Sequence, residues 1–178
     1  PCKRIARHGY EITWLQPDAF GRVSAEQVRE AIRPDTILVT IMAANNEIGT
    51  IQPVEEIASV AHERNVLFHT DAVQAAAYLP VDVQALGVDM MSLGAHKFYG
   101  PKGVGALYVR KGTPLISHLT GGGQEFSLRA GTQNVPYIVG FGVACKIAKD
   151  TLPVFSREVR TLRDNLYKNL LDGIDNER

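Results

Sequence analysis

The chain has 178 residues, of which 45% are hydrophobic and 21% charged, and its 19 basic residues balance 19 acidic ones. This length and composition predict one soluble globular domain with a substantial core. A net charge of zero argues against nucleic acid and anionic membrane as partners. The longest apolar stretch, Val135 to Cys145, is too short to span a bilayer. We therefore expect a small-molecule ligand.

The two cysteines, Cys2 and Cys145, lie far apart and have no CxxC or Cys/His spacing. This spacing argues against a metal site and against a disulfide framework, and it fits a reducing, cytoplasmic compartment. The chain begins at Pro1 without an initiator Met and enters a helical pattern at once. We expect residues 1–178 to form a single domain that was cut from a longer protein.

The first half of the chain alternates strand and helix patterns. Ser24, with Gln27 three residues later, predicts a capping box at a helix start, and Pro53 suits the first turn of another helix. The expected elements in chain order are a basic helical tail (1–8), a strand (10–15), a helix opening at 24, a buried strand (36–42) and a helix (53–65).

The second half continues the alternation. The expected elements are an apolar strand (66–70), a small-residue helical patch (72–77), strands at 89–93 and 105–110, and two helices within 134–171 that break near Pro153. Strands alternating with helices imply right-handed crossovers. We therefore predict an α/β fold, with a mostly parallel sheet and helices on both faces.

Polar side chains follow three of these strands, where ligands bind in open α/β sheets. Asn46 follows the strand at 36–42, Asp71 the strand at 66–70, and His96 with Lys97 the strand at 89–93. Pyridoxal phosphate needs a carboxylate for its pyridinium nitrogen and a lysine that carries its aldehyde as a Schiff base. Asp71 and Lys97 could take these roles.

The residues alone leave other interpretations open. Asp71 could be a helix cap or turn, Lys97 a solvated amine, and His96 a structural histidine. Asn45 and Asn46 could form a turn, Gln74 could be an exposed helix residue, and Arg129 could belong to a structural ion pair. The glycine segments at 100–103 and 121–123 could be tight turns or could face a ligand.

Four segments carry a resemblance to a known family: AANNEIGTIQPVEEIA (43–58), HTDAVQAA (69–76), GAHKFYGPKGVGALYVR (94–110) and GGGQEFSLRAGTQNVPYIVGFG (121–142). They resemble successive motifs of the cysteine desulfurases, and the similarity runs from about Gly9 to Leu152. The resemblance implies the aminotransferase class V fold, in which a large domain carries pyridoxal 5'-phosphate and the enzyme is a homodimer. The chain would be part of that large domain.

The resemblance also implies roles for single residues. Lys97 would hold the cofactor and transfer protons, and Asp71 would partner the pyridinium nitrogen. Gln74 and Asn46 would lie near the phenolic oxygen of the ring. The remaining cofactor-binding residues would be Gly94, Ala95 and His96, of which His96 would contact the phosphate or assist catalysis, and Thr132, which would reach the phosphate of the neighbouring subunit's cofactor.

Two departures from the family matter. Gly94 stands where family members usually have a serine that would donate to the cofactor phosphate, which predicts a weaker hold on the cofactor. The chain also lacks the family's N-terminal part and its C-terminal domain, which carries the substrate-binding arginine and the nucleophilic cysteine. Neither Cys2 nor Cys145 matches the loop of the missing domain that carries the nucleophilic cysteine. We expect Cys145 to lie in the core.

The resemblance implies a transferase that moves sulfur from L-cysteine to an enzyme cysteine, leaving L-alanine and a persulfide. The persulfide would pass to an acceptor such as an iron-sulfur scaffold protein, and the chain by itself would be inactive. A selenocysteine lyase and a non-catalytic fragment remain alternatives. A Rossmann-type nucleotide binder is disfavoured, because no GxGxxG motif opens a helix after the first strand.

Overall fold

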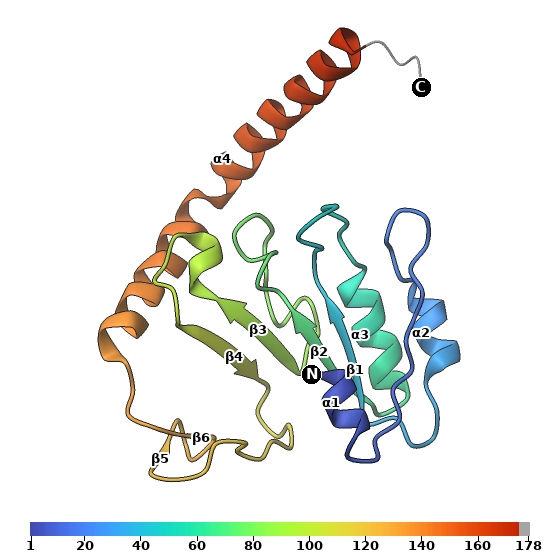
Figure 1. Ribbon diagram of the computed structural model, residues 1–178, viewed down its shortest axis with the longest axis vertical. Coiled ribbons are helices and arrows are strands. Elements are labelled where there is room, and N and C mark those ends of the chain that lie inside the picture. Colours follow the sequence, from blue (N-terminus) through green and yellow to red (C-terminus); the bar gives the residue numbers. More distant parts are fainter. Residues whose placement is uncertain (175–178) are drawn as a thin grey trace. The chain divides into compact units, whose positions relative to one another are not determined.

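The computed structural model describes residues 1–174, and Figure 1 shows its elements. They are the helices α1 (Cys2–Ala6), α2 (Ala25–Ala31), α3 (Val54–Glu63) and α4 (Val135–Gly173), the 3-10 turn η1 (Ala95–Phe98), and the strands β1 (Leu38–Met42), β2 (Leu67–Asp71), β3 (Met90–Gly94), β4 (Gly105–Val109), β5 (Gly123–Gln124) and β6 (Arg129–Ala130).

Four strands form one sheet in the order β1-β2-β3-β4. β1 and β3 both pair in parallel with β2, which aligns Met42, Asp71 and Ser92 across the three strands. β4 runs the other way along β3, because the Arg110 amide donates to the Asp89 carbonyl (2.8 Å) and the Ala95 amide to the Val104 carbonyl (3.2 Å). The predicted mostly parallel sheet is confirmed.

The chain divides into two compact units. The first comprises Pro1–Ala72, Asp82–Ser92 and Leu107–Pro114. The second comprises Val73–Val81, Leu93–Ala106 and the described residues from Leu115 onward. Strands β3 and β4 contribute residues to both units, so the chain passes between the units within the sheet.

In the first unit, α3 contacts both β2 and α2. Phe68 and Thr70 of β2 are fully buried, as are Ile57 and Ala61 of α3. Alternate residues along a strand point to opposite faces, so Phe68 and Thr70 lie on the helix-covered face and His69 on the other. The predicted capping box of α2 is confirmed: Gln27 donates its amide to Ser24 Oγ (3.1 Å), and Gln27 Oε1 accepts from the Ser24 amide (2.9 Å).

Two elements expected from the sequence are wrong. Residues 10–15 form no strand, and Tyr10 and Trp14 are exposed, because this segment has no pairing partner. Residues 72–77 form no helix: a series of turns covers 73–78, closed by the Leu79 amide donating to the Ala75 carbonyl (2.8 Å). A segment this short cannot offset the cost of helix nucleation.

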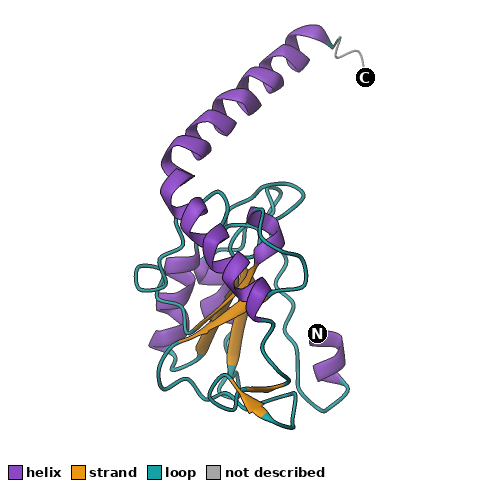
Figure 2. Ribbon diagram, turned by 90° about the vertical axis from the view of Figure 1, so that its left-hand side faces the viewer, coloured by secondary structure: helices purple, strands orange, loops and turns teal. Residues whose placement is uncertain are grey.

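Helix α4 is continuous over 39 residues, so the predicted break near Pro153 is wrong. Figure 2 shows it as one long helix. Proline lacks one helical donor, but the helix continues without interruption through Pro153. Close by, Phe155 stacks on Tyr78 (ring centroids 5.9 Å apart) and Ser156 Oγ donates to the Tyr78 carbonyl (2.7 Å). None of the helices in residues 1–174 is long and apolar enough to cross a membrane.

The buried carboxylate of Asp89 joins three elements of the first unit. Its Oδ2 accepts from the Phe68 amide of β2 (2.8 Å) and bonds His62 Nε2 of α3 (2.9 Å). Its Oδ1 lies 3.3 Å from Arg110 Nε, just beyond β4. A carboxylate that is only 5% exposed requires such partners, because an unpaired buried charge is strongly destabilising.

We expect Asp89→Ala to lower the free energy of unfolding by about 3 kcal/mol, because it leaves the buried Phe68 amide, His62 and Arg110 without their acceptor. Urea denaturation followed by circular dichroism measures the loss. Asp35→Ala is the matched control, since it removes an exposed carboxylate 3.0 Å from Arg33 Nε and should cost less than about 1 kcal/mol. Equal losses in the two variants would contradict the structural role of Asp89.

Candidate functional site

The residues that the sequence singles out are divided between the two units. Asn46 and Asp71 belong to the first unit, and Gln74, Gly94, Ala95, His96, Lys97 and Thr132 belong to the second. Each group has its own supporting contacts. The first group supplies a side-chain amide and a carboxylate, and the second supplies a side-chain amide, an imidazole, an amine and a hydroxyl.

Asp71 is the last residue of β2 and lies in register with Met42 of β1 and Ser92 of β3. Its carbonyl accepts from the Ala43 amide (2.8 Å), and the next amide, of Ala72, donates to the Ser92 carbonyl (3.0 Å). The residue itself is exposed. The structure therefore places a carboxylate at the carboxyl end of three parallel strands, where open α/β sheets bind ligands.

The two asparagines after β1 differ in role. Asn45 Oδ1 accepts from the amides of Glu47 (2.9 Å) and Ile48 (3.1 Å), which makes Asn45 a turn residue. Asn46 lies within this turn and is exposed. The turn interpretation thus holds for Asn45, whereas the side chain of Asn46 projects into solvent.

His69 is a site residue that the sequence did not single out. Its Nδ1 lies 2.7 Å from Thr40 Oγ1 of β1, and its Nε2 lies 2.8 Å from Ser92 Oγ of β3. Burial lowers the pKa of the imidazole, against a smaller raising effect of the Asp71 charge. The available signal was its position two residues before Asp71, which puts both on one face of the strand. Its hydroxyl partners became visible only with the strand register.

His96 and Lys97 lie on the short turn η1, directly after β3. Within this turn Ala95 and Phe98 are buried, whereas His96 and Lys97 are exposed. Lys97 makes no side-chain hydrogen bond or ion pair with any residue in 1–174. The turn closes where the Gly100 amide donates to the Ala95 carbonyl (2.9 Å), with Tyr99 in the left-handed conformation (φ 66°).

Packing against α4 holds η1 in place. The rings of Phe98 and Phe141 lie 5.5 Å apart, in a buried cluster that also contains Ala77, Ala95 and Ala144. A Cβ at Gly100 would lie 2.9 Å from Ala95 Cβ and 3.2 Å from Ala144 Cβ. A Cβ at Gly140 would lie 2.8 Å from Pro101 Cγ. The two glycines permit this close approach, so Gly100 has a packing role.

Gly94 has an extended backbone (φ −132°, ψ 118°), which any residue can adopt. A Cβ there would lie 3.1 Å from Val73 Cγ1, a tight contact that requires the valine to shift. The glycine is therefore explained by the neighbouring Val73 side chain and not by backbone strain.

Gln74 carries an unusual polar atom. Its Oε1 is buried and has no hydrogen-bond partner among the described residues. Buried polar atoms in folded proteins almost always have a partner, and one without points to a missing ligand or water. The alternative interpretation of Gln74 as an exposed helix residue is wrong, since Gln74 is half-buried and lies in the turns after β2.

Thr132 follows the hairpin of β5 and β6 and is exposed. Arg129 of β6 lies 3.5 Å from Glu125 Oε1 and donates to the Gly131 carbonyl (2.6 Å), so the ion-pair interpretation of Arg129 holds. Three consecutive residues with positive φ, from Glu125 to Ser127, form the hairpin turn. A Cβ at Gly123 would lie 3.0 Å from Ser127 Oγ, so this glycine serves the turn.

The prediction of a core position for Cys145 is wrong, because this residue is exposed. The buried residues of helix α4 are Phe141 and Ala144, and Cys145, the next residue along the helix, lies outside this buried face. Desolvation by its neighbours still raises the pKa of the Cys145 thiol. Cys2 of α1 is half-buried, and no disulfide joins the two.

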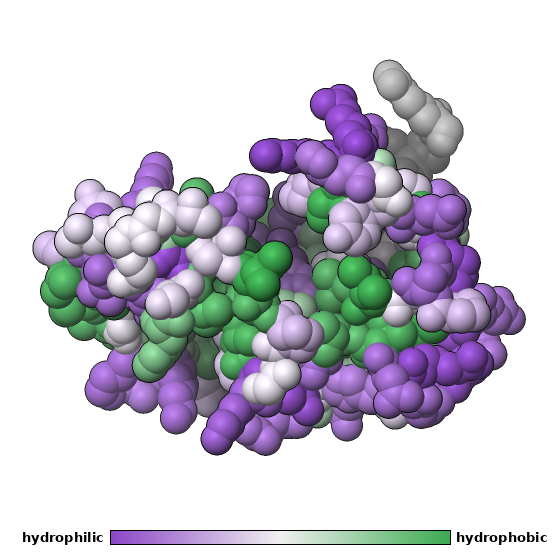
Figure 3. Space-filling model, turned by 90° about the horizontal axis from the view of Figure 1, so that it is seen from below, coloured by the Kyte–Doolittle hydropathy of each residue, from purple (hydrophilic) through white to green (hydrophobic). Residues whose placement is uncertain are grey.

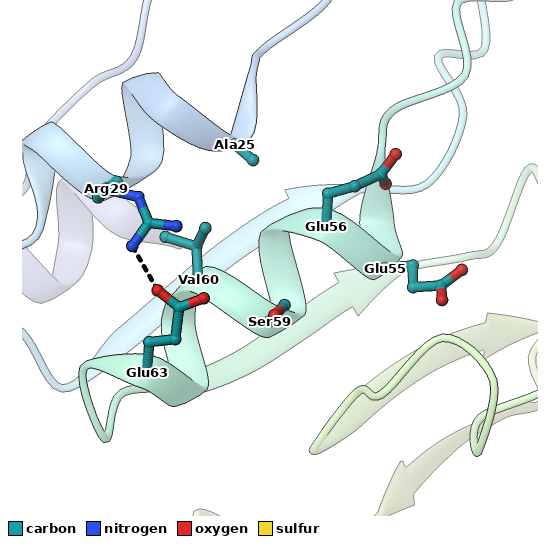
Figure 4. A pocket seen from close by; sticks show the side chains of 7 residues that line it. All are labelled: Ala25, Arg29, Glu55, Glu56, Ser59, Val60 and Glu63. Atoms are coloured by element: carbon teal, nitrogen blue, oxygen red, sulfur yellow. Dashed lines mark hydrogen bonds and ion pairs between the residues drawn. The ribbon is translucent and has the colours of Figure 1, made fainter.

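A separate open pocket of about 530 Å³ lies along α2 and α3 (Figure 4). Its lining includes Glu55, Glu56 and the ion pair of Arg29 with Glu63. The hydrogen bond from Arg29 lowers the pKa of the Glu63 carboxyl. None of the predicted site residues lines this pocket, and we assign it no role in the site.

Sequence comparison identifies close relatives. Residues 1–177 match the family model described as aminotransferase class V. The cysteine desulfurase IscS of Methanosarcina thermophila is 51% identical over 170 residues, covering 96% of this chain and 42% of the relative. The mitochondrial cysteine desulfurase of Arabidopsis thaliana is 47% identical over 176 residues, covering 98% of this chain and 39% of the relative. The chain thus spans about two fifths of the length of these relatives.

Solved structures agree with this result. A NifS-like protein superposes with a TM-score of 0.92 at 43% identity, covering 96% of this chain and 47% of that one. A structure of SspA in complex with cysteine superposes with a TM-score of 0.79 at 51% identity, covering 82% of this chain and 42% of that one. With its fold and nearly its whole length matched, this chain belongs to the aminotransferase class V family.

Proposed function

We propose that this chain is part of the cofactor-binding large domain of a pyridoxal-phosphate-dependent cysteine desulfurase. In the overall reaction the C–S bond of L-cysteine breaks and an S–S bond forms to an enzyme cysteine. The thiol proton and the substrate carbon skeleton leave as L-alanine, and the enzyme retains the sulfur as a persulfide. No external oxidant or reductant is needed for this balance.

The observation that carries the proposal is the placement of Lys97. Its amine projects from a turn that is anchored by Phe98, and it has no hydrogen bond or ion pair within residues 1–174. An exposed lysine on a rigid turn directly after a sheet strand suits the capture of an aldehyde carbon. The 51% identity to a cysteine desulfurase supports the same assignment.

The residues present fit pyridoxal 5'-phosphate. The cofactor has a basic ring nitrogen, which suits the carboxylate of Asp71, and a phenolic oxygen, which suits the amide of Gln74. The buried Gln74 Oε1 has no hydrogen-bond partner among residues 1–174, which supports this assignment, and the amide can turn to present either its oxygen or its nitrogen. When bound, the cofactor supplies an electron sink for the substrate carbon.

The chain's own residues divide the remaining work. We assign Lys97 to the cofactor aldehyde, which its amine would hold, and to proton transfer at the substrate carbon. The negative charge of Asp71 would favour the protonated form of the ring nitrogen. His96 is exposed beside Lys97 and supplies an imidazole for the phosphate or for proton transfer. Asn46 is assigned to the phenolic side of the ring.

The phosphate would lie at the start of η1, next to Gly94, Ala95 and His96. Gly94 offers no hydroxyl there, so backbone amides and His96 must supply the contacts. Thr132 is assigned to the phosphate of a neighbouring subunit's cofactor, which requires a homodimer.

Exposed apolar side chains support a homodimer. The second unit exposes large apolar residues between β4 and β6 and on the first turns of α4. Figure 3 shows apolar side chains, in green, exposed on the face of the molecule seen from below. Patches of this kind mark association surfaces. The residues are Ile116 (91% exposed), Leu119, Phe126 (98%), Val135, Val139 and Val143.

We further propose that L-cysteine is the substrate, that the sulfur acceptor is an iron-sulfur scaffold or other acceptor protein, and that the enzyme is cytoplasmic. The similar SspA structure in complex with cysteine supports the substrate. The absence of a disulfide between Cys2 and Cys145 within the described chain fits a reducing compartment.

Incubation with pyridoxal phosphate followed by borohydride reduction should label Lys97. Peptide mapping by mass spectrometry measures the position of the label. The neighbouring Lys102 provides an internal control, because it lies outside η1 on the following loop. A label on Lys102 or Lys111, with none on Lys97, would overturn the assignment.

Restoring a hydroxyl at position 94 should tighten cofactor binding only when space is made for it. Gly94→Ser alone should have little effect, because its Cβ would meet Val73 Cγ1 at 3.1 Å. Gly94→Ser with Val73→Ala should lower the dissociation constant of pyridoxal phosphate by about tenfold, as expected for one hydrogen bond to a charged group. Spectrophotometric titration measures this constant, with Val73→Ala as the control. An unchanged double variant would show that the phosphate lies elsewhere.

The 178-residue chain should not convert L-cysteine to alanine, even with excess pyridoxal phosphate. A raised thiol pKa makes Cys145 a poor nucleophile, and Cys2 lies half-buried in α1. Alanine and sulfide assays beside a Lys97→Ala variant measure this. Turnover that depends on Lys97 would show that one of these two cysteines acts as the sulfur acceptor.

A further inference from the structure

A hydrogen-bonded bridge crosses three strands on the less buried face of the sheet. His69 stands at its centre on β2 and uses both ring nitrogens, one with Thr40 of β1 (2.7 Å) and the other with Ser92 of β3 (2.8 Å). All three residues belong to the first unit. The bridge ties together side chains of the strands whose carboxyl ends carry the proposed site.

The bridge lies directly beside Asp71. His69 and Asp71 are two residues apart on β2 and share a face of the strand, which places their Cα atoms about 6.6 Å apart. Ser92, the β3 end of the bridge, is the in-register neighbour of Asp71. The bridge thus includes a residue of the strand that carries Asp71, namely His69, and the residue paired with Asp71, namely Ser92.

We propose that His69 is a positioning residue for Asp71. As an uncharged bridge between Thr40 and Ser92, His69 keeps the Asp71 carboxylate directed toward the ring nitrogen of the cofactor. Because the bridge carries no positive charge, it does not compete with that nitrogen for the carboxylate. This inference rests on the proposed function. His69 itself contacts neither cofactor nor substrate in the proposal.

The hydrogen-bonding pattern suits an uncharged ring. A neutral imidazole has one donor and one acceptor, and each hydroxyl can donate or accept, so both contacts are satisfied without a second ring proton. Burial lowers the pKa of His69 and outweighs the opposite effect of Asp71. β1 and β3 present the hydroxyls of Thr40 and Ser92 to the ring, and Asp71 of the same strand is the charged group that acts on it.

The uncharged state matters for the carboxylate. A cationic imidazole two residues away would attract Asp71 and lower its affinity for a pyridinium cation. A positive charge at His62 would not act on Asp71 in this way, because the hydrogen-bond partner of His62 is the buried carboxylate of Asp89 (2.9 Å). His62 therefore offers a matched control for adding charge at a histidine.

The first test requires no cofactor. In the wild-type chain, nitrogen-15 NMR of the imidazole should show a neutral His69 at pH 7 and a titration midpoint below the ordinary value of about 6.5. The unfolded chain then binds a proton at His69 more readily than the folded chain does. The free energy of unfolding should therefore fall as the pH drops below about 6.5. The contribution of His69 to this fall should be absent in His69→Gln. Thr40→Val should change the chemical shift of Nδ1. A His69 that is cationic at pH 7 would overturn the inference.

The second test measures the dissociation constant of pyridoxal phosphate by spectrophotometric titration. At pH 8 we expect His69→Gln to bind within about threefold of wild type, and His69→Lys to bind roughly tenfold more weakly because it adds a cation beside Asp71. His62→Lys should leave the constant unchanged. A merely structural His69 predicts similar losses for Gln and Lys, and that result would overturn the inference.

The pH dependence separates this inference from the proposed function. The ratio of the wild-type constant to the His69→Gln constant should be near one at pH 8 and should rise as the pH falls through the His69 titration, since the cofactor's own protonation affects both chains alike. A flat ratio, with Lys97 labelled normally by borohydride, would overturn the role of His69 alone. Absence of the Lys97 label in the wild-type chain would overturn the proposed function and this inference with it.

Discussion

The parallel register of β1, β2 and β3 is the constraint on which the rest of the proposed chemistry depends. It brings Met42 and Asp71, the last residues of β1 and β2, side by side with Ser92 in the middle of β3. A shift of one residue would turn Asp71 to the opposite face, against the helix-covered core that contains Phe68 and Thr70. Burial of that face therefore also fixes the direction in which the carboxylate points.

Two histidines of the first unit, His62 and His69, differ in their hydrogen-bond partners and in their roles. His62 meets the buried carboxylate of Asp89, which also accepts from the Phe68 amide and lies beside Arg110. This arrangement joins a helix to the sheet. His69 meets two hydroxyls, and burial disfavours its charged form. His62 therefore supports the fold, whereas the proposed role of His69 is to bridge two strands without placing a positive charge beside Asp71.

In the second unit, apolar packing positions a polar group. Lys97 is exposed, yet its turn is held by Phe98 against Phe141 and by the close approach of Gly100 to Ala144. The flexible lysine stem thus extends from a rigid base, which limits the positions that its amine can reach. Gln74 belongs to the same unit, and its buried Oε1 has no hydrogen-bond partner within residues 1–174.

The sequence by itself determined the fold class, the capping box at Ser24 and the positions of Asp71 and Lys97 after their strands, because these follow from local periodicity and from long motifs. It did not reveal that residues 10–15 stay unpaired, that α4 continues through Pro153, or that Cys145 is exposed, because each depends on which surfaces other segments cover. The bridge through His69 was decided by tertiary structure alone. Thr40 and Ser92 lie 29 and 23 residues from His69 in the chain, and only strand pairing brings the three together.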